Sequence, residues 1–121
     1  RAASDSGLQI SLLHGNRDFL LGAGFAAATG IRLIGDPYIL STPEWQFVLS
    51  HGDALCLDDT AYMAFRAQVR NPEWQSALLA KPLAERRAIA AHMREVSELS
   101  HRGKDSSYTD LNPTATDDFL R

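Results

Sequence analysis

The stretch His14-Gly15-Asn16-Arg17-Asp18-Phe19-Leu20-Leu21-Gly22 decides how this chain folds. It follows an apolar run, Leu8 to Leu13, which we interpret as a buried strand, and it precedes an Ala-rich segment typical of a helix. Open α/β sheets carry their functional groups in polar turns at the carboxyl ends of strands. Here the glycine allows a sharp turn, the Asn16 carbonyl suits a metal ion, and the Arg17 guanidinium suits a phosphate. The stretch therefore predicts an α/β fold with a binding turn after its first strand.

A second block of the same kind follows. Trp45–Ser50 is typical of a strand, and it leads directly into His51-Gly52-Asp53, where a histidine at a strand end suits a metal site. A Gly35-Asp36-Pro37 turn lies between the blocks. Around it we expect a helix over Gly22–Thr29 that ends at Gly30, and strands over Ile31–Ile34 and Tyr38–Leu40.

From Asp58 onward the sequence predicts helices. Each expected helix has its own start signal, such as an Asp or Asn N-cap or a proline in the first turn. The expected helices begin at Asp58 or Asp59 (reaching about Val69), at Asn71-Pro72, at Pro82 (with Ile89, Met93 and Val96 on one face) and at Asn112-Pro113. Trp45 and Trp74 are expected to pack in the interior.

Several separated blocks of the sequence resemble one family. Gly-Asn-(His/Arg)-Asp is a signature of the calcineurin-like metallophosphoesterases, and the Arg form followed by Phe-Leu-Leu-Gly is similar to their UDP-2,3-diacylglucosamine diphosphatase branch. The His51-Gly52-Asp53 block, the segment 58–66 and the spacing of Ser97, His101 and Lys104 also resemble this branch. Several blocks in one order are more specific than one short motif. The resemblance runs from about Leu8 to Asn112.

The resemblance implies the central part of a metallophosphoesterase β-sandwich flanked by helices and followed by a helical cap insertion. Residues 1–57 would be a partial α/β core, 58–111 the cap that binds substrate, and 112–121 the start of a core helix. The family also uses an Asp-x-His, a Gly-Asp after the next strand and a late Gly-His-x-His. The first and last are absent here, and Gly35-Asp36 follows the Asn16 block instead. We therefore expect an internal fragment of a larger enzyme, inactive by itself.

The resemblance also implies roles for single residues, each of which has a plainer interpretation as a turn residue, a helix N-cap or a solvated helix face. Asn16 and His51 would bind metal. Arg17 would replace the usual family histidine and act on the phosphates, which leaves the general acid open. The implied substrate-binding residues are Asn16, Arg17, Asp59, Ser97, His101 and Lys104. The implied supporting residues are His14, Asp18 (capping the next helix or holding the loop), Asp53 (orienting His51 through its other nitrogen) and Arg94.

The implied reaction is metal-dependent hydrolysis of the pyrophosphate of UDP-2,3-diacylglucosamine to UMP and 2,3-diacylglucosamine 1-phosphate, in lipid A biosynthesis. Two Mn²⁺ ions, ~3.5–4 Å apart, would share a hydroxide in the full-length protein, with iron and zinc as competitors. The expected location is cytoplasmic and peripheral on the cytoplasmic face of the inner membrane, with no obligate protein partner. Two alternatives stay open: another metallophosphoesterase acting on nucleotides, and a non-catalytic binding fragment.

Composition fits one domain or part of one. The chain has 121 residues, of which 45% are hydrophobic and 22% charged, close to ordinary globular usage. A net charge of −3 gives no electrostatic indication of nucleic-acid binding. The single cysteine, Cys56, cannot form an internal disulfide and fits a reducing compartment. No apolar run approaches the ~20 residues of a membrane span.

Overall fold

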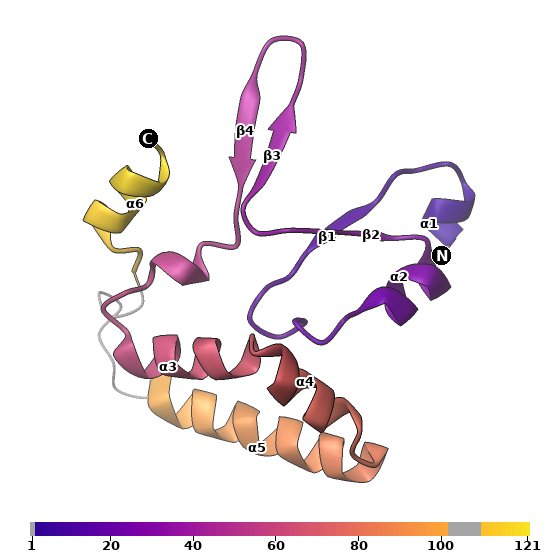
Figure 1. Cartoon of the computed structure of the whole chain (residues 1–121), viewed down its shortest axis with the longest axis vertical. Coiled ribbons are helices and arrows are strands. Elements are labelled where there is room, and N and C mark those ends of the chain that lie inside the picture. Colours follow the sequence, from indigo (N-terminus) through magenta and orange to yellow (C-terminus); the bar gives the residue numbers. More distant parts are fainter. Residues whose placement is uncertain (1, 102–109) are drawn as a thin grey trace. The chain divides into compact units, whose positions relative to one another are not determined.

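The computed structural model describes residues 2–101 and 110–121 (Figure 1). It shows a mixed α/β chain in two compact units, residues 1–54 and residues 55–121, and each unit is described by itself. The first unit contains α1 (Ala2–Asp5), β1 (Ser11–Leu13), α2 (Ala23–Thr29), β2 (Arg32–Ile34), β3 (Tyr38–Ser41) and β4 (Gln46–Leu49). A short 3-10 helix, Asp53–Leu55, follows β4. The mixed α/β class confirms the coarse expectation, whereas the β-sandwich and its three-segment division stay predictions.

Strands β1 and β2 form a parallel pair, with Leu12 opposite Leu33. Parallel strands need a crossover connection, and here it consists of the 14–22 loop and α2, which packs against β2. Helix α2 ends as expected at Gly30, whose φ of 75° lies in the left-handed region and whose N–H donates to the Ala26 carbonyl oxygen at 2.8 Å. The 14–22 loop therefore leaves the carboxyl end of β1 (Figure 1).

The first strand is shorter and more exposed than the expected buried strand over Leu8–Leu13. Leu8 is 62% exposed and lies outside β1, so it is neither buried nor part of the strand. The residues before β1 form the short helix α1 instead, an element that the sequence does not predict. The Gly7 N–H donates to the Ser4 carbonyl oxygen at 3.1 Å, and the Leu8 N–H donates to the Ala3 carbonyl oxygen at 3.3 Å.

Strands β3 and β4 form an antiparallel hairpin in which Tyr38 lies opposite Leu49 and Ser41 opposite Gln46. Both strands agree with the expected ranges to within one residue at each end. The hairpin turn is closed by Thr42, whose hydroxyl oxygen accepts from the Trp45 N–H at 2.9 Å. Trp45 was expected to pack, but it is 67% exposed, and every residue of β4 is exposed in this unit.

The second unit is helical, with α3 (Thr60–Val69), α4 (Pro72–Leu79), α5 (Leu83–His101) and α6 (Pro113–Phe119). The start signals are confirmed, because Asp59, Asn71 and Asn112 each accept a backbone N–H at the N-terminus of the following helix. α6 ends at Phe119, although the sequence suggests a helix that continues to the end of the chain.

Packing in the helical unit centres on α3 and α4, which contact each other and bury Val69 and Leu78. The half-buried side chains of α5 include Ile89, Met93 and Ser97, whereas Val96 is 51% exposed. The expected apolar face is therefore correct for the first two residues and wrong for Val96. None of the described helices combines the length and the apolar character that a membrane span requires.

Candidate functional site

The 14–22 loop is braced at both ends. The buried Gly15 donates its N–H to Asp18 Oδ1 at 2.5 Å, and His14 Nε2 donates to the Leu21 carbonyl oxygen at 2.7 Å. The Leu21 N–H in turn donates to the Asp18 carbonyl oxygen at 2.9 Å. Asp18 thus holds the loop, and its expected alternative role as a helix cap is wrong, because Gly22 is the N-cap residue of α2 and no side chain caps this helix.

Asn16 and Arg17 lie between these braces, and both are exposed. A braced loop fixes the backbone from which their side chains extend, so both groups are presented to solvent from a defined position. An amide oxygen and a guanidinium side by side can bind a cation and an anion, respectively.

His51 lies beyond the end of β4. Its Nδ1 is 3.5 Å from Oδ1 of Asp53, a carboxylate that is 6% exposed, while the His51 side chain itself is 34% exposed. A carboxylate next to Nδ1 favours the proton on that nitrogen and leaves the lone pair on Nε2, which is the form that binds metal. The role of Asp53 in orienting His51 stays a prediction.

Gly15 brings the two sequence blocks together. A Cβ placed on Gly15 would lie 2.9 Å from His51 Nε2 and 3.0 Å from His51 Cδ2, so the imidazole rests directly against the glycine backbone. Asn16 is the next residue along the chain, so the two sequence blocks meet at this point. The part of the chain that the structure describes holds no group of three or more His, Cys, Asp or Glu side chains that could bind a metal ion.

Asp36 also belongs to this site, although the sequence indicates only a turn there. Its Oδ1 accepts from the Ser50 hydroxyl at 2.6 Å, and its Oδ2 accepts from the His51 N–H at 3.2 Å. The signal that reveals it is the hairpin register: two residues beyond the Tyr38–Leu49 pair, the same register places Asp36 opposite His51.

No family model matches the chain. Individual relatives do match it, and all three described here are named UDP-2,3-diacylglucosamine hydrolase. The protein of Chromobacterium violaceum is 58% identical over 91 residues, 75% of this chain and 38% of the relative. That of Cellvibrio japonicus is 48% identical over 110 residues, which are 91% of this chain and 46% of the relative. That of Chromohalobacter salexigens is 40% identical over 121 residues, which are 100% of this chain and 49% of the relative.

The sequence belongs to the UDP-2,3-diacylglucosamine hydrolase family. The chain spans less than half the length of these relatives. Because the match to the Chromohalobacter salexigens protein covers this whole chain, the hydrolase-family similarity includes both the Asn16 and the His51 block.

The remaining site residues expected from the hydrolase family lie in the second unit. Asp59 is 6% exposed, and its Oδ1 accepts from the Tyr62 N–H at 3.0 Å, so it serves as the N-cap of α3. Ser97 is half-buried on α5, and Arg94 is exposed on the same helix. His101 is the last residue of α5, while its side chain and all of Lys104 lie outside the described residues. Their substrate contacts stay predictions.

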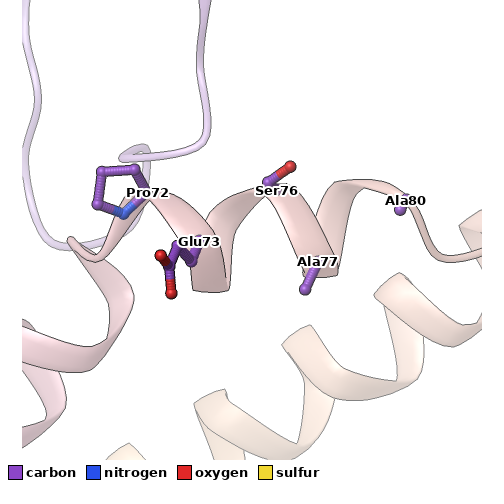
Figure 2. Close-up of a pocket in the computed structure, with 5 residues that line it drawn as sticks. All are labelled: Pro72, Glu73, Ser76, Ala77 and Ala80. Atoms are coloured by element: carbon purple, nitrogen blue, oxygen red, sulfur yellow. The ribbon is translucent and has the colours of Figure 1, made fainter.

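A shallow surface depression on α4 carries none of these residues. Figure 2 shows its lining, which consists of Pro72, Glu73, Ser76, Ala77 and Ala80. Most of the lining is apolar and Glu73 is its one ionisable group, so it offers neither a cationic group for a phosphate nor a set of ligands for a metal ion. Among the described residues, the best candidate site is therefore the region around Gly15 and His51, and not the depression on α4.

Proposed function

We propose that this chain is part of a full-length enzyme that hydrolyses the pyrophosphate of UDP-2,3-diacylglucosamine to UMP and 2,3-diacylglucosamine 1-phosphate in lipid A biosynthesis. The observation that carries this proposal is the contact between the His51 ring and Gly15, which joins the two expected ligand blocks. The support from sequence is the 40–58% identity to proteins named for this hydrolysis. The 121 residues supply only two of the expected ligands, so by themselves they should be inactive.

The donor set fits manganese. Asn16 would contribute an amide oxygen and His51 an imidazole nitrogen, which are ligand types that manganese accepts. Asp53 faces the other nitrogen of His51, as a ligand histidine requires. When bound, two manganese ions would supply a hydroxide nucleophile at neutral pH and offset the charge that develops on phosphorus.

Arg17 would bind the pyrophosphate. Its planar guanidinium can donate two parallel hydrogen bonds to phosphate oxygens, and these bonds strengthen as negative charge builds up during hydrolysis. The Gly15–Asp18 and His14–Leu21 hydrogen bonds hold the backbone on both sides of Arg17, so this donor is placed before substrate arrives.

The second unit would hold the acylated sugar through Asp59, Ser97, His101 and Lys104, with Arg94 supporting the phosphate. Because the substrate and one product are lipids, we place the enzyme on the cytoplasmic face of the inner membrane as a peripheral protein. The UMP product is soluble and would depart into the cytoplasm.

Gly15→Ala should impair the enzyme by displacing His51. The new methyl group would lie 2.9–3.0 Å from the imidazole and 3.4 Å from Asp18 Oδ1, closer to the ring than real side chains come. A displacement of about 1 Å at a reacting centre can cost on the order of 10²-fold in rate. The measurement is kcat/KM of the full-length enzyme. Gly24→Ala is the matched control, because a Cβ there meets nothing within 4 Å, and equal activities in the two variants would contradict the proposed contact.

Lys104→Ala tests whether the helical unit recognises the lipid substrate. Loss of one hydrogen bond to a charged group should weaken transition-state binding by about 1.5–3 kcal/mol for UDP-2,3-diacylglucosamine. Hydrolysis of a small activated phosphodiester, which lacks the acylated sugar, should be unchanged. Lys81→Ala is the control, since Lys81 pairs with Glu85 at the surface, 3.3 Å away. Equal losses of transition-state binding on both substrates would favour the alternative of a metallophosphoesterase that acts on nucleotides. Absence of any manganese-dependent turnover in the wild-type protein would favour the alternative of a non-catalytic binding fragment.

A further inference from the structure

The Asp36 carboxylate holds the backbone on both sides of the His51 side chain. One oxygen accepts from the Ser50 hydroxyl at 2.6 Å and the other from the His51 N–H at 3.2 Å. The same Ser50 oxygen accepts from the Gly52 N–H at 3.1 Å. Three consecutive residues are thus connected to a single half-buried carboxylate.

This connection begins where strand pairing stops. The β3–β4 ladder ends at the Tyr38–Leu49 pair, so residues 50–52 lie beyond its last rung. Gly52 then turns the chain with a φ of 83° toward Asp53, which faces His51 Nδ1. Hydrogen bonds to an ionised carboxylate are about twice as strong as neutral ones. Asp36 is therefore well placed to define the backbone position of the His51 turn.

The His51 ring has little tolerance for movement. Its Nε2 edge rests against Gly15, and its Nδ1 lies 3.5 Å from Asp53. A small rotation of the His51 backbone would move Nε2 away from Gly15 or press the ring onto it. The position of the ring thus depends on the atoms that hold residues 50–52.

We propose that Asp36 is a positioning residue, which holds the His51 backbone so that Nε2 is presented to a divalent cation beside Gly15 and Asn16. The proposal rests on the proposed function for the identity of the cation. The competing explanation is that Asp36 only stabilises the hairpin. Thr42 provides the matched comparison, because its hydroxyl forms the corresponding bonds to Trp45 at the other end of the same hairpin, at 2.9 and 3.1 Å.

The experiment compares Asp36→Asn with Thr42→Ala in the full-length enzyme. An Asn side chain keeps the shape but has one acceptor oxygen, so one of the two bonds is lost. Binding of Mn²⁺ is followed without substrate by the loss of the free-ion electron paramagnetic resonance signal, and unfolding temperature is measured without metal. We expect Asp36→Asn to bind Mn²⁺ about 10–100-fold more weakly than wild type, as is typical when a group supporting a ligand is removed. Thr42→Ala should bind it normally.

Wild-type Mn²⁺ affinity in Asp36→Asn would overturn the proposal, as would equal affinity losses in both variants. If Asp36→Asn does not fold, Ser50→Ala replaces it. This change removes the bond from the Ser50 hydroxyl to Asp36 and the bond from the Gly52 N–H to that hydroxyl, and it keeps the carboxylate. Wild-type affinity in Ser50→Ala would then overturn the proposal. A wild-type enzyme that binds Mn²⁺ but does not hydrolyse UDP-2,3-diacylglucosamine would refute the proposed function alone, because the Asp36 comparison is read from metal binding.

Discussion

Replacing His51 by Ala in the full-length enzyme is expected to abolish most of its hydrolase activity while the protein stays folded. The imidazole is the expected metal ligand, so its removal should cost more than the 10–100-fold typical of groups that merely support a ligand. Stability should change little, because the side chain is 34% exposed and lies at a strand end instead of in the core. The measurements are kcat at saturating manganese and the midpoint of thermal unfolding.

His92→Ala is the matched control for this experiment. His92 is an exposed histidine on α5, and its loss should leave both activity and unfolding temperature at wild-type values. If His51→Ala retained a near-normal rate at saturating manganese, the site around Gly15 would be wrongly assigned. If His51→Ala lost activity only because the protein unfolds, His51 would have a structural role and not a role as metal ligand.

The parts of the fold that sequence predicted well depend on short-range interactions. Asn71 accepts from the N–H groups of Glu73 and Trp74, at 2.8 and 3.0 Å, and Asn112 accepts from Ala115 at 3.0 Å. Such bonds connect residues two or three apart, so a short sequence window contains all of their determinants. The same holds for Gly30, whose left-handed φ follows from its position after an Ala-rich helix.

The parts that sequence did not predict depend on pairing between distant segments. The bonds from Ser50 and His51 to Asp36 span 14 and 15 residues, and they exist only in the observed hairpin register. The contact between His51 and Gly15 likewise requires the whole crossover and hairpin between them. The family resemblance predicted that both blocks serve one site, whereas composition and periodicity could not.

Burial was also predicted poorly in the first unit. Apolar side chains indicated a buried first strand and a packed Trp45, yet Leu8 is 62% exposed and Trp45 67% exposed. Apolar composition specifies a strand that can be buried, but a two-stranded hairpin has no second layer of its own to bury it. Secondary structure therefore followed from the residues themselves, and burial did not.

Arg17→Ala in the full-length enzyme is expected to lower kcat/KM by about 10²–10³, the usual cost of removing one donor that stabilises developing negative charge. Arg17 is exposed beside Asn16 in the braced loop, so its loss should leave the unfolding temperature unchanged. It should also leave Mn²⁺ affinity unchanged, because a guanidinium is not a metal ligand. This separates it from His51→Ala, which should affect both metal binding and rate.

Arg17→Lys distinguishes the geometry of the donor from its charge. A lysine keeps the positive charge but replaces the planar fork by a single ammonium group, so it should recover only part of the lost activity. Arg87→Ala, at an exposed position of α5, is the control for loss of a surface charge and should have wild-type kcat/KM. If Arg17→Ala matched Arg87→Ala, Arg17 would be an ordinary solvated side chain. The enzyme would then have to stabilise the pyrophosphate through groups other than the Gly-Asn-Arg-Asp turn.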